Sequence, residues 1–88
     1  MPTISLFYGI AIRMYVNDHS PPHFHAVYGG SEACFAIETG TVLEGYLPKT
    51  AERLAREWAA LNYDGLMENW RLAREGRMPN PIGGLDVE

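Results

Sequence analysis

Two adjacent glycines, Gly29 and Gly30, divide a run of alternating apolar and polar residues, and this pattern constrains the fold more than any other feature. Glycine adopts positive φ without strain, so a Gly-Gly pair suits the two-residue turn of a β-hairpin. Pairing outward from the turn predicts the cross-strand pairs Tyr28–Ser31, Val27–Glu32, Ala26–Ala33, His25–Cys34 and Phe24–Phe35. A slip of one residue would mix the two faces, so the alternation favours this register.

The predicted hairpin has two unlike faces. Its apolar face carries Phe24, Ala26, Tyr28, Ala33, Phe35 and Ile37. Its other face carries His23, His25, Val27, Glu32, Cys34 and Ala36. Because side chains two residues apart on a strand point the same way, His23 and His25 project together from the second face.

A second turn is predicted at Glu38, Thr39 and Gly40, with the glycine in the left-handed conformation. This three-residue turn pairs the next strand with the hairpin as Phe35–Leu43, Cys34–Glu44 and Ala33–Gly45. Leu43 and Leu47 then join the apolar face, whereas Glu44 and Tyr46 join the histidine face. The two turns together predict a row of side chains across three strands, His25–Cys34–Glu44.

Two further strands are predicted before the hairpin, in residues 4–7 and 10–16, with Tyr8-Gly9 as the reversal between them. In the second run one face carries Ile10, Ile12, Met14 and Val16, and the other carries Ala11, Arg13 and Tyr15. Turn residues from Asn17 to Pro22 then interrupt the alternation.

After Pro48 the apolar residues take the three-and-four spacing of amphipathic helices. One stripe consists of Ala51, Leu54, Ala55, Trp58 and Leu61, and a second consists of Leu66, Met67, Trp70 and Ala73. We expect the first helix to begin near Ala51 with Thr50 as its cap. The second follows a link, residues 62–65, in which Asp64 is the cap, and Gly76 ends it.

These elements predict one α+β domain over residues 1–76, followed by an extended C-terminal tail, residues 77–88. Its antiparallel, meander-like sheet has about five strands, and two C-terminal helices pack on one face with both tryptophans in the core. The chain then has nothing left to cover the other face, which carries the histidines, Arg13 and Tyr15. We therefore expect that face to meet solvent or a partner.

Composition narrows the class of protein. The formal net charge is −4, which argues against a general nucleic-acid coat, and the helical arginines alternate with glutamates at ion-pair spacings. No apolar run approaches the ~20 residues of a membrane helix. The start shows no export signal, and a single cysteine fits a reducing compartment. We therefore expect a cytoplasmic protein.

All three histidines, His19, His23 and His25, lie within seven residues. Imidazole is the commonest metal ligand and exchanges protons near neutral pH, so this segment is the candidate site. One hypothesis is a zinc-type site in which His23 and His25 bind the ion, completed by one of His19, Cys34, Glu44 and Glu32.

A second hypothesis is a metal-independent ribonuclease. One histidine takes the ribose 2′-proton and another protonates the leaving oxygen, with Arg13 or Lys49 stabilising the phosphorane and Asp18 or Glu44 orienting an imidazole. The candidate catalytic residues are His23 and His25, supported by His19, Arg13 and Glu44. A third hypothesis is a non-catalytic protein-interaction surface on the same face.

The chain resembles, over nearly its whole length, the small bacterial family called domain of unknown function 4160. The segments that carry the resemblance are Pro2-Thr3-Ile4-Ser5, Phe7-Tyr8-Gly9-Ile10, Arg13-Met14-Tyr15, Asp18-His19, Pro21-Pro22-His23-Phe24-His25-Ala26, Tyr28-Gly29-Gly30, Glu38-Thr39-Gly40, Leu43-Glu44-Gly45 and Glu68-Asn69-Trp70. An aliphatic residue is expected where this chain has Cys34. The resemblance brings no established catalytic residues.

The resemblance also implies a partner. Members are often encoded beside a protein of the family called domain of unknown function 2442, and the pair is suggested to form a toxin–antitoxin-like module. The resemblance therefore implies that this chain is one half of such a module, acting through its histidine-bearing sheet face with RNA as a candidate target.

Overall fold

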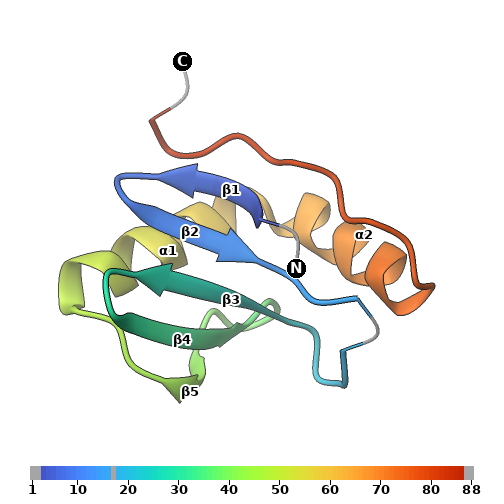
Figure 1. Ribbon diagram of the computed structural model, residues 1–88, viewed down its shortest axis with the longest axis horizontal. Coiled ribbons are helices and arrows are strands. Elements are labelled where there is room, and N and C mark those ends of the chain that lie inside the picture. The colour runs from blue at the N-terminus through green and yellow to red at the C-terminus, as the bar shows by residue number, and fades with distance from the viewer. Residues whose placement is uncertain (1–2, 17, 87–88) are drawn as a thin grey trace.

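The computed structural model describes residues 3–16 and 18–86, and Figure 1 shows the arrangement of the elements. The strands are β1 (Thr3–Phe7), β2 (Ile10–Arg13), β3 (His23–Tyr28), β4 (Ser31–Ala36) and β5 (Val42–Gly45), and the helices are α1 (Lys49–Leu61) and α2 (Tyr63–Arg74). The strands form one antiparallel sheet in the order β1-β2-β3-β4-β5. The predicted α+β fold with a meander sheet is confirmed.

The central hairpin has the predicted register. All five pairs from Tyr28–Ser31 to Phe24–Phe35 are present, and His23 pairs with Ala36 beyond them. Gly29 has a φ of 58°, which a side chain would strain. The Tyr8-Gly9 reversal is also confirmed, since Phe7 pairs with Ile10 across it.

The second turn is one residue longer than predicted. Ala36 N–H donates to the Thr41 carbonyl and Gly40 N–H donates to the Ala36 carbonyl, so the loop runs from Ile37 to Gly40. Phe35 consequently pairs with Val42, and the predicted Phe35–Leu43 pair is wrong.

A bulge at Leu43 restores the register beyond this loop. Cys34 pairs with Glu44 and Ala33 with Gly45, as predicted. The bulge takes Leu43 out of the alternation, so it lies 46 % exposed beside the histidines rather than on the apolar face.

Because side chains alternate between the two faces of each strand, the core lies on one side of the sheet. The rings of Phe24 and Phe35 stack with centroids 5.2 Å apart, and Trp58 of α1 packs on Phe24 and Phe7. Both helices lie on this side of the sheet (Figure 1). The opposite side, here called the open face, carries Leu6, Ala11, Arg13, His25, Val27, Glu32, Cys34 and Glu44, all of which are partly or fully exposed.

The helix boundaries differ from the prediction. The helix α1 begins at Lys49 with Pro48 at the cap position, and α2 follows after Asn62 alone. Neither N-terminus has a side-chain capping bond, so the predicted caps Thr50 and Asp64 are wrong. Because Asn62 alone separates α1 from α2, the predicted link 62–65 is absent and Asp64 lies inside α2.

The helical stripes are mostly confirmed. The tryptophans are buried, Trp58 fully and Trp70 to 7 % exposure, and both lie in or beside the core. Leu61, by contrast, is 75 % exposed and does not belong to the stripe. Gly76 ends the helical region with a φ of 77°, as predicted.

The described part of the tail, residues 77–86, has no regular secondary structure and runs beside β1 (Figure 1). Ile82 N–H donates to the Ile4 carbonyl, and Trp58 Nε1 donates to the Gly83 carbonyl. Val87 and Glu88 of the predicted tail, and the predicted turn residue Asn17, lie outside the described residues. Within the described ranges, no helix combines the length and the apolar character needed to cross a membrane.

Gly45 offers a test of the β4–β5 register. Its φ is +83°, and a Cβ atom there would lie 2.2 Å from the Glu32 carbonyl oxygen. We expect Gly45→Ala to lower the free energy of unfolding by at least about 2 kcal/mol, measured by urea unfolding. The matched control is Gly30→Ala, where an added Cβ meets nothing within 4 Å. Equal stability of both variants would contradict the register.

Candidate functional site

The site lies where the loop between β2 and β3 meets the open face. A pocket of about 590 Å³ opens there, with loop residues on one side and β4 and β5 on the other. Its wall includes the loop residues Tyr15 and Asp18, and Glu44 across the pocket. We call it the histidine pocket, because His19, His23 and His25 all line it.

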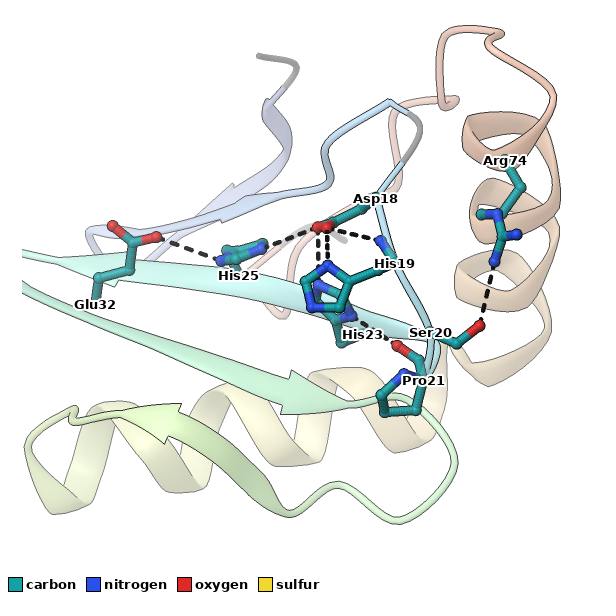
Figure 2. Close-up of polar contacts among 8 residues, drawn as sticks. All are labelled: Asp18, His19, Ser20, Pro21, His23, His25, Glu32 and Arg74. Atoms are coloured by element: carbon teal, nitrogen blue, oxygen red, sulfur yellow. Dashed lines mark hydrogen bonds and ion pairs between the residues drawn. The ribbon is translucent and has the colours of Figure 1, made fainter.

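The Asp18 carboxylate is the centre of the site, with the three histidine rings around it (Figure 2). Its Oδ1 accepts from the His19 backbone N–H and contacts His19 Nδ1, both at 2.9 Å. Its Oδ2 lies 2.8 Å from His23 Nε2 and 3.5 Å from His25 Nε2. One carboxylate therefore brings all three imidazoles together.

Both ring nitrogens of His23 face oxygen atoms. Nδ1 donates to the Pro21 carbonyl oxygen at 2.6 Å, because a carbonyl can only accept. Nε2 faces Asp18 Oδ2, so a doubly protonated ring donates to both oxygens. A neutral ring keeps its proton on Nδ1 and leaves the Nε2 lone pair directed into the site.

His23 is buried, contrary to the expectation that this face exposes both histidines. Its exposed fraction is 4 %, and its ring packs against Trp70 with centroids 5.1 Å apart. The loop and α2 cover it together, since Arg74 donates to Ser20 Oγ (Figure 2). The two rings nonetheless project together, with the centroids of His23 and His25 5.2 Å apart.

His25 lies on the open face and is more exposed than His23, at 19 % against 4 %. Its Nδ1 is 3.4 Å from Glu32 Oε2. The rings of His25 and Tyr15 are nearly perpendicular, with their centroids 4.4 Å apart. Its Nε2 is buried without a hydrogen-bond partner in the described part of the chain. This nitrogen is the least satisfied polar atom of the site.

The surroundings of Asp18 favour its ionised form. Burial by itself would raise the pKa of this carboxyl group. The hydrogen bond from the His19 backbone and the bonds and charge of His23 act in the opposite direction, and together they hold the pKa below its ordinary value of 3.8.

The surroundings of Cys34 favour the thiol. Burial raises its pKa to about 11, and the carboxylates of Asp18, Glu44 and Glu32 add to the effect. Burial, with Glu32 next, likewise raises the pKa of the Tyr15 hydroxyl. Neither group is an activated nucleophile at neutral pH.

Some of the other candidate residues line the histidine pocket and others do not. The row His25–Cys34–Glu44 is present and extends to Arg13, which pairs with His25. Arg13 shares the open face but does not line the histidine pocket. His19 is at the rim, 87 % exposed.

Two further candidate residues, Lys49 and Asp18, lie in different places. Lys49, a candidate for stabilising a phosphorane, is at the start of α1 and does not line the histidine pocket. The sequence suggested Asp18 or Glu44 as the carboxylate that orients an imidazole, but it carried no sign that Asp18 contacts all three histidine rings.

The chain belongs to the family described as Domain of unknown function (DUF4160), which it matches over residues 9–71. No curated protein and no solved structure matches it. The matched range includes the loop, the histidines and the strands that line the histidine pocket.

The charges of the histidine pocket favour cations over anions. Asp18, Glu32 and Glu44 line it, and none of the described lining residues is lysine or arginine. These three carboxylates therefore repel phosphate groups from the pocket. The arrangement suits a cation or a cationic side chain.

Asp18 makes the stability of the fold pH-dependent. Because the folded state lowers its pKa, the stabilisation is complete above the ordinary value of 3.8 and disappears as the pH falls through the folded-state value. We expect Asp18→Asn to lower the free energy of unfolding by about 1–2 kcal/mol at pH 7. Urea unfolding at pH 3 should show a smaller difference. An equal difference at both pH values would contradict the role of the carboxylate charge.

The raised pKa of the Cys34 thiol can be tested by its rate of alkylation. With its pKa raised to about 11, the thiol should react with iodoacetamide much more slowly than free cysteine at pH 8, and the rate should rise up to about pH 11. The labelling is measured by mass spectrometry in the presence of a chelator. A rate at pH 8 equal to that of free cysteine would show that burial and the carboxylates do not raise the pKa of the thiol.

Proposed function

We propose that this protein binds a second, basic protein through the histidine pocket and the open face around it, as one half of a two-protein, toxin–antitoxin-like module. The acidic lining of the histidine pocket is the observation that supports this role best. The carboxylates of Glu32 and Glu44 attract a lysine or arginine side chain of the partner and repel a nucleic-acid backbone.

The apolar part of the open face supports the same role. Leu6 is 66 % exposed and Leu43, at the pocket wall, is 46 % exposed. Exposed leucines beside charged groups are typical of the mixed surface of a protein interface. A second copy of this chain suits the surface poorly, because the same carboxylates would then face each other.

Cleavage of RNA by the histidines is a weaker candidate. His23 is buried with both nitrogens in contact with oxygen atoms, and the nearby carboxylates oppose phosphate binding. The family resemblance makes the protein encoded by the neighbouring gene the first partner to test.

The test is co-expression with the neighbouring gene product, followed by measurement of the Kd. We expect a complex whose affinity falls with salt, and at least about tenfold weaker binding for Glu44→Lys because it reverses a charge in the pocket. The matched control is Leu61→Ala, which removes an exposed leucine from α1 and should leave the Kd unchanged.

The absence of a complex would overturn the proposal, and so would equal weakening by Leu61→Ala and Glu44→Lys. Degradation of cellular RNA on expression of the wild type that disappears in His25→Ala would overturn the placing of RNA cleavage as the weaker candidate.

A further inference from the structure

Three potential metal ligands converge at the floor of the histidine pocket. One ligand atom from each of His23, His25 and Cys34 lies within 4.8 Å of the others. Ligand atoms around a tetrahedral zinc ion are roughly 3.5 Å apart, as zinc–nitrogen and zinc–sulfur bond lengths require. Small side-chain rotations are therefore enough to bring the three atoms onto one ion.

Two imidazole nitrogens already point to one place. Asp18 Oδ2 is 2.8 Å from His23 Nε2 and 3.5 Å from His25 Nε2 (Figure 2). The His25 nitrogen is buried and has no hydrogen-bond partner among the described residues. Such an atom normally has a partner, and a cation between the two rings and the carboxylate would be one.

The groups behind the ligands hold them in the orientation that binding needs. The Pro21 carbonyl oxygen accepts from His23 Nδ1 at 2.6 Å, which leaves Nε2 for an ion. Glu32 Oε2 is 3.4 Å from the Nδ1 of His25. Metal-bound histidines commonly use their second nitrogen in this way, with a backbone carbonyl or a carboxylate.

Asp18 lies outside the three-ligand cluster, but its Oδ2 contacts both imidazoles of the cluster and is therefore suited to be the fourth ligand. The His19 backbone N–H and ring contact its Oδ1, so Oδ2 is the oxygen directed at the rings of His23 and His25. With Cys34 bound as the thiolate and its proton released to solvent, the two anionic ligands balance a divalent ion. The filled site is then neutral, which lowers the penalty for burying charge.

We propose that His23 Nε2, His25 Nε2, Cys34 Sγ and Asp18 Oδ2 form a tetrahedral site for a zinc-type divalent transition-metal ion. Nitrogen and sulfur ligands select such ions over Mg²⁺ and Ca²⁺, which prefer oxygen. The proposal does not depend on binding of a partner protein, because every ligand comes from this chain.

The test uses purified full-length protein without an affinity tag, stripped with a chelator and titrated with Co²⁺. We expect saturation at one ion per chain, with the visible bands of tetrahedral cobalt and a thiolate-to-cobalt charge-transfer band. Zn²⁺ should displace the cobalt, and Mg²⁺ should not. A titration that does not saturate, or bands of octahedral cobalt, would overturn the proposal.

Substitutions of single residues test which side chains are ligands. We expect Cys34→Ser to lose the charge-transfer band and His25→Gln to weaken Zn²⁺ binding at least about tenfold in competition with a chromophoric chelator. Both positions are only partly buried, so circular dichroism should show an intact fold. Retention of the charge-transfer band in Cys34→Ser would exclude Cys34 as a ligand and overturn the proposed set.

The matched control is His19→Ala. It also removes an imidazole from the pocket, but this ring is 87 % exposed, lies outside the three-ligand cluster and contacts Oδ1 of Asp18, not the proposed ligand atom Oδ2. We expect a change in affinity of no more than about fivefold, the range of an exposed ion pair. Equal weakening by His19→Ala and His25→Gln would indicate non-specific binding by surface histidines and would refute the site.

Discussion

The pairing of β3 with β4 is the constraint on which the rest of the structure depends. On one side of this hairpin Phe24 stacks on Phe35, with ring centroids 5.2 Å apart, and the helices pack against them. On the other side His25 lies opposite Cys34. Because side chains alternate along a strand, one register builds both the core and the floor of the histidine pocket. A shift of one residue would exchange them.

The loop before β3 adds Asp18 and His19 to this polar face and so completes the histidine pocket. Asp18 holds the imidazoles together, while Arg74 and Trp70 of α2 hold the loop and bury His23. The outcome is a small pocket with carboxylates, imidazoles and one thiol. Such a set of groups attracts cations, and this common property underlies both the partner and the metal that we propose.

Repeating local patterns were sufficient to predict most of the fold. The alternation around Gly29-Gly30 predicted the hairpin pairs, and the spacing of Trp58 and Trp70 predicted two helices that pack on the sheet. The errors fell at boundaries. The loop from Ile37 to Gly40 and the start of α1 depend on individual backbone hydrogen bonds, for which no periodic signal exists.

The grouping of His23, His25 and Cys34 on one face followed from the amino-acid order, because strand geometry repeats every two residues. Glu44, by contrast, joins them only because a bulge at Leu43 offsets the longer loop. The burial of His23 and the central place of Asp18 came only from the folded chain. Trp70 is about fifty residues away from His23, and Arg74 is about fifty residues away from Ser20, while Asp18 is in an irregular segment. Contacts of that kind arise from packing between distant segments, so no local pattern encodes them.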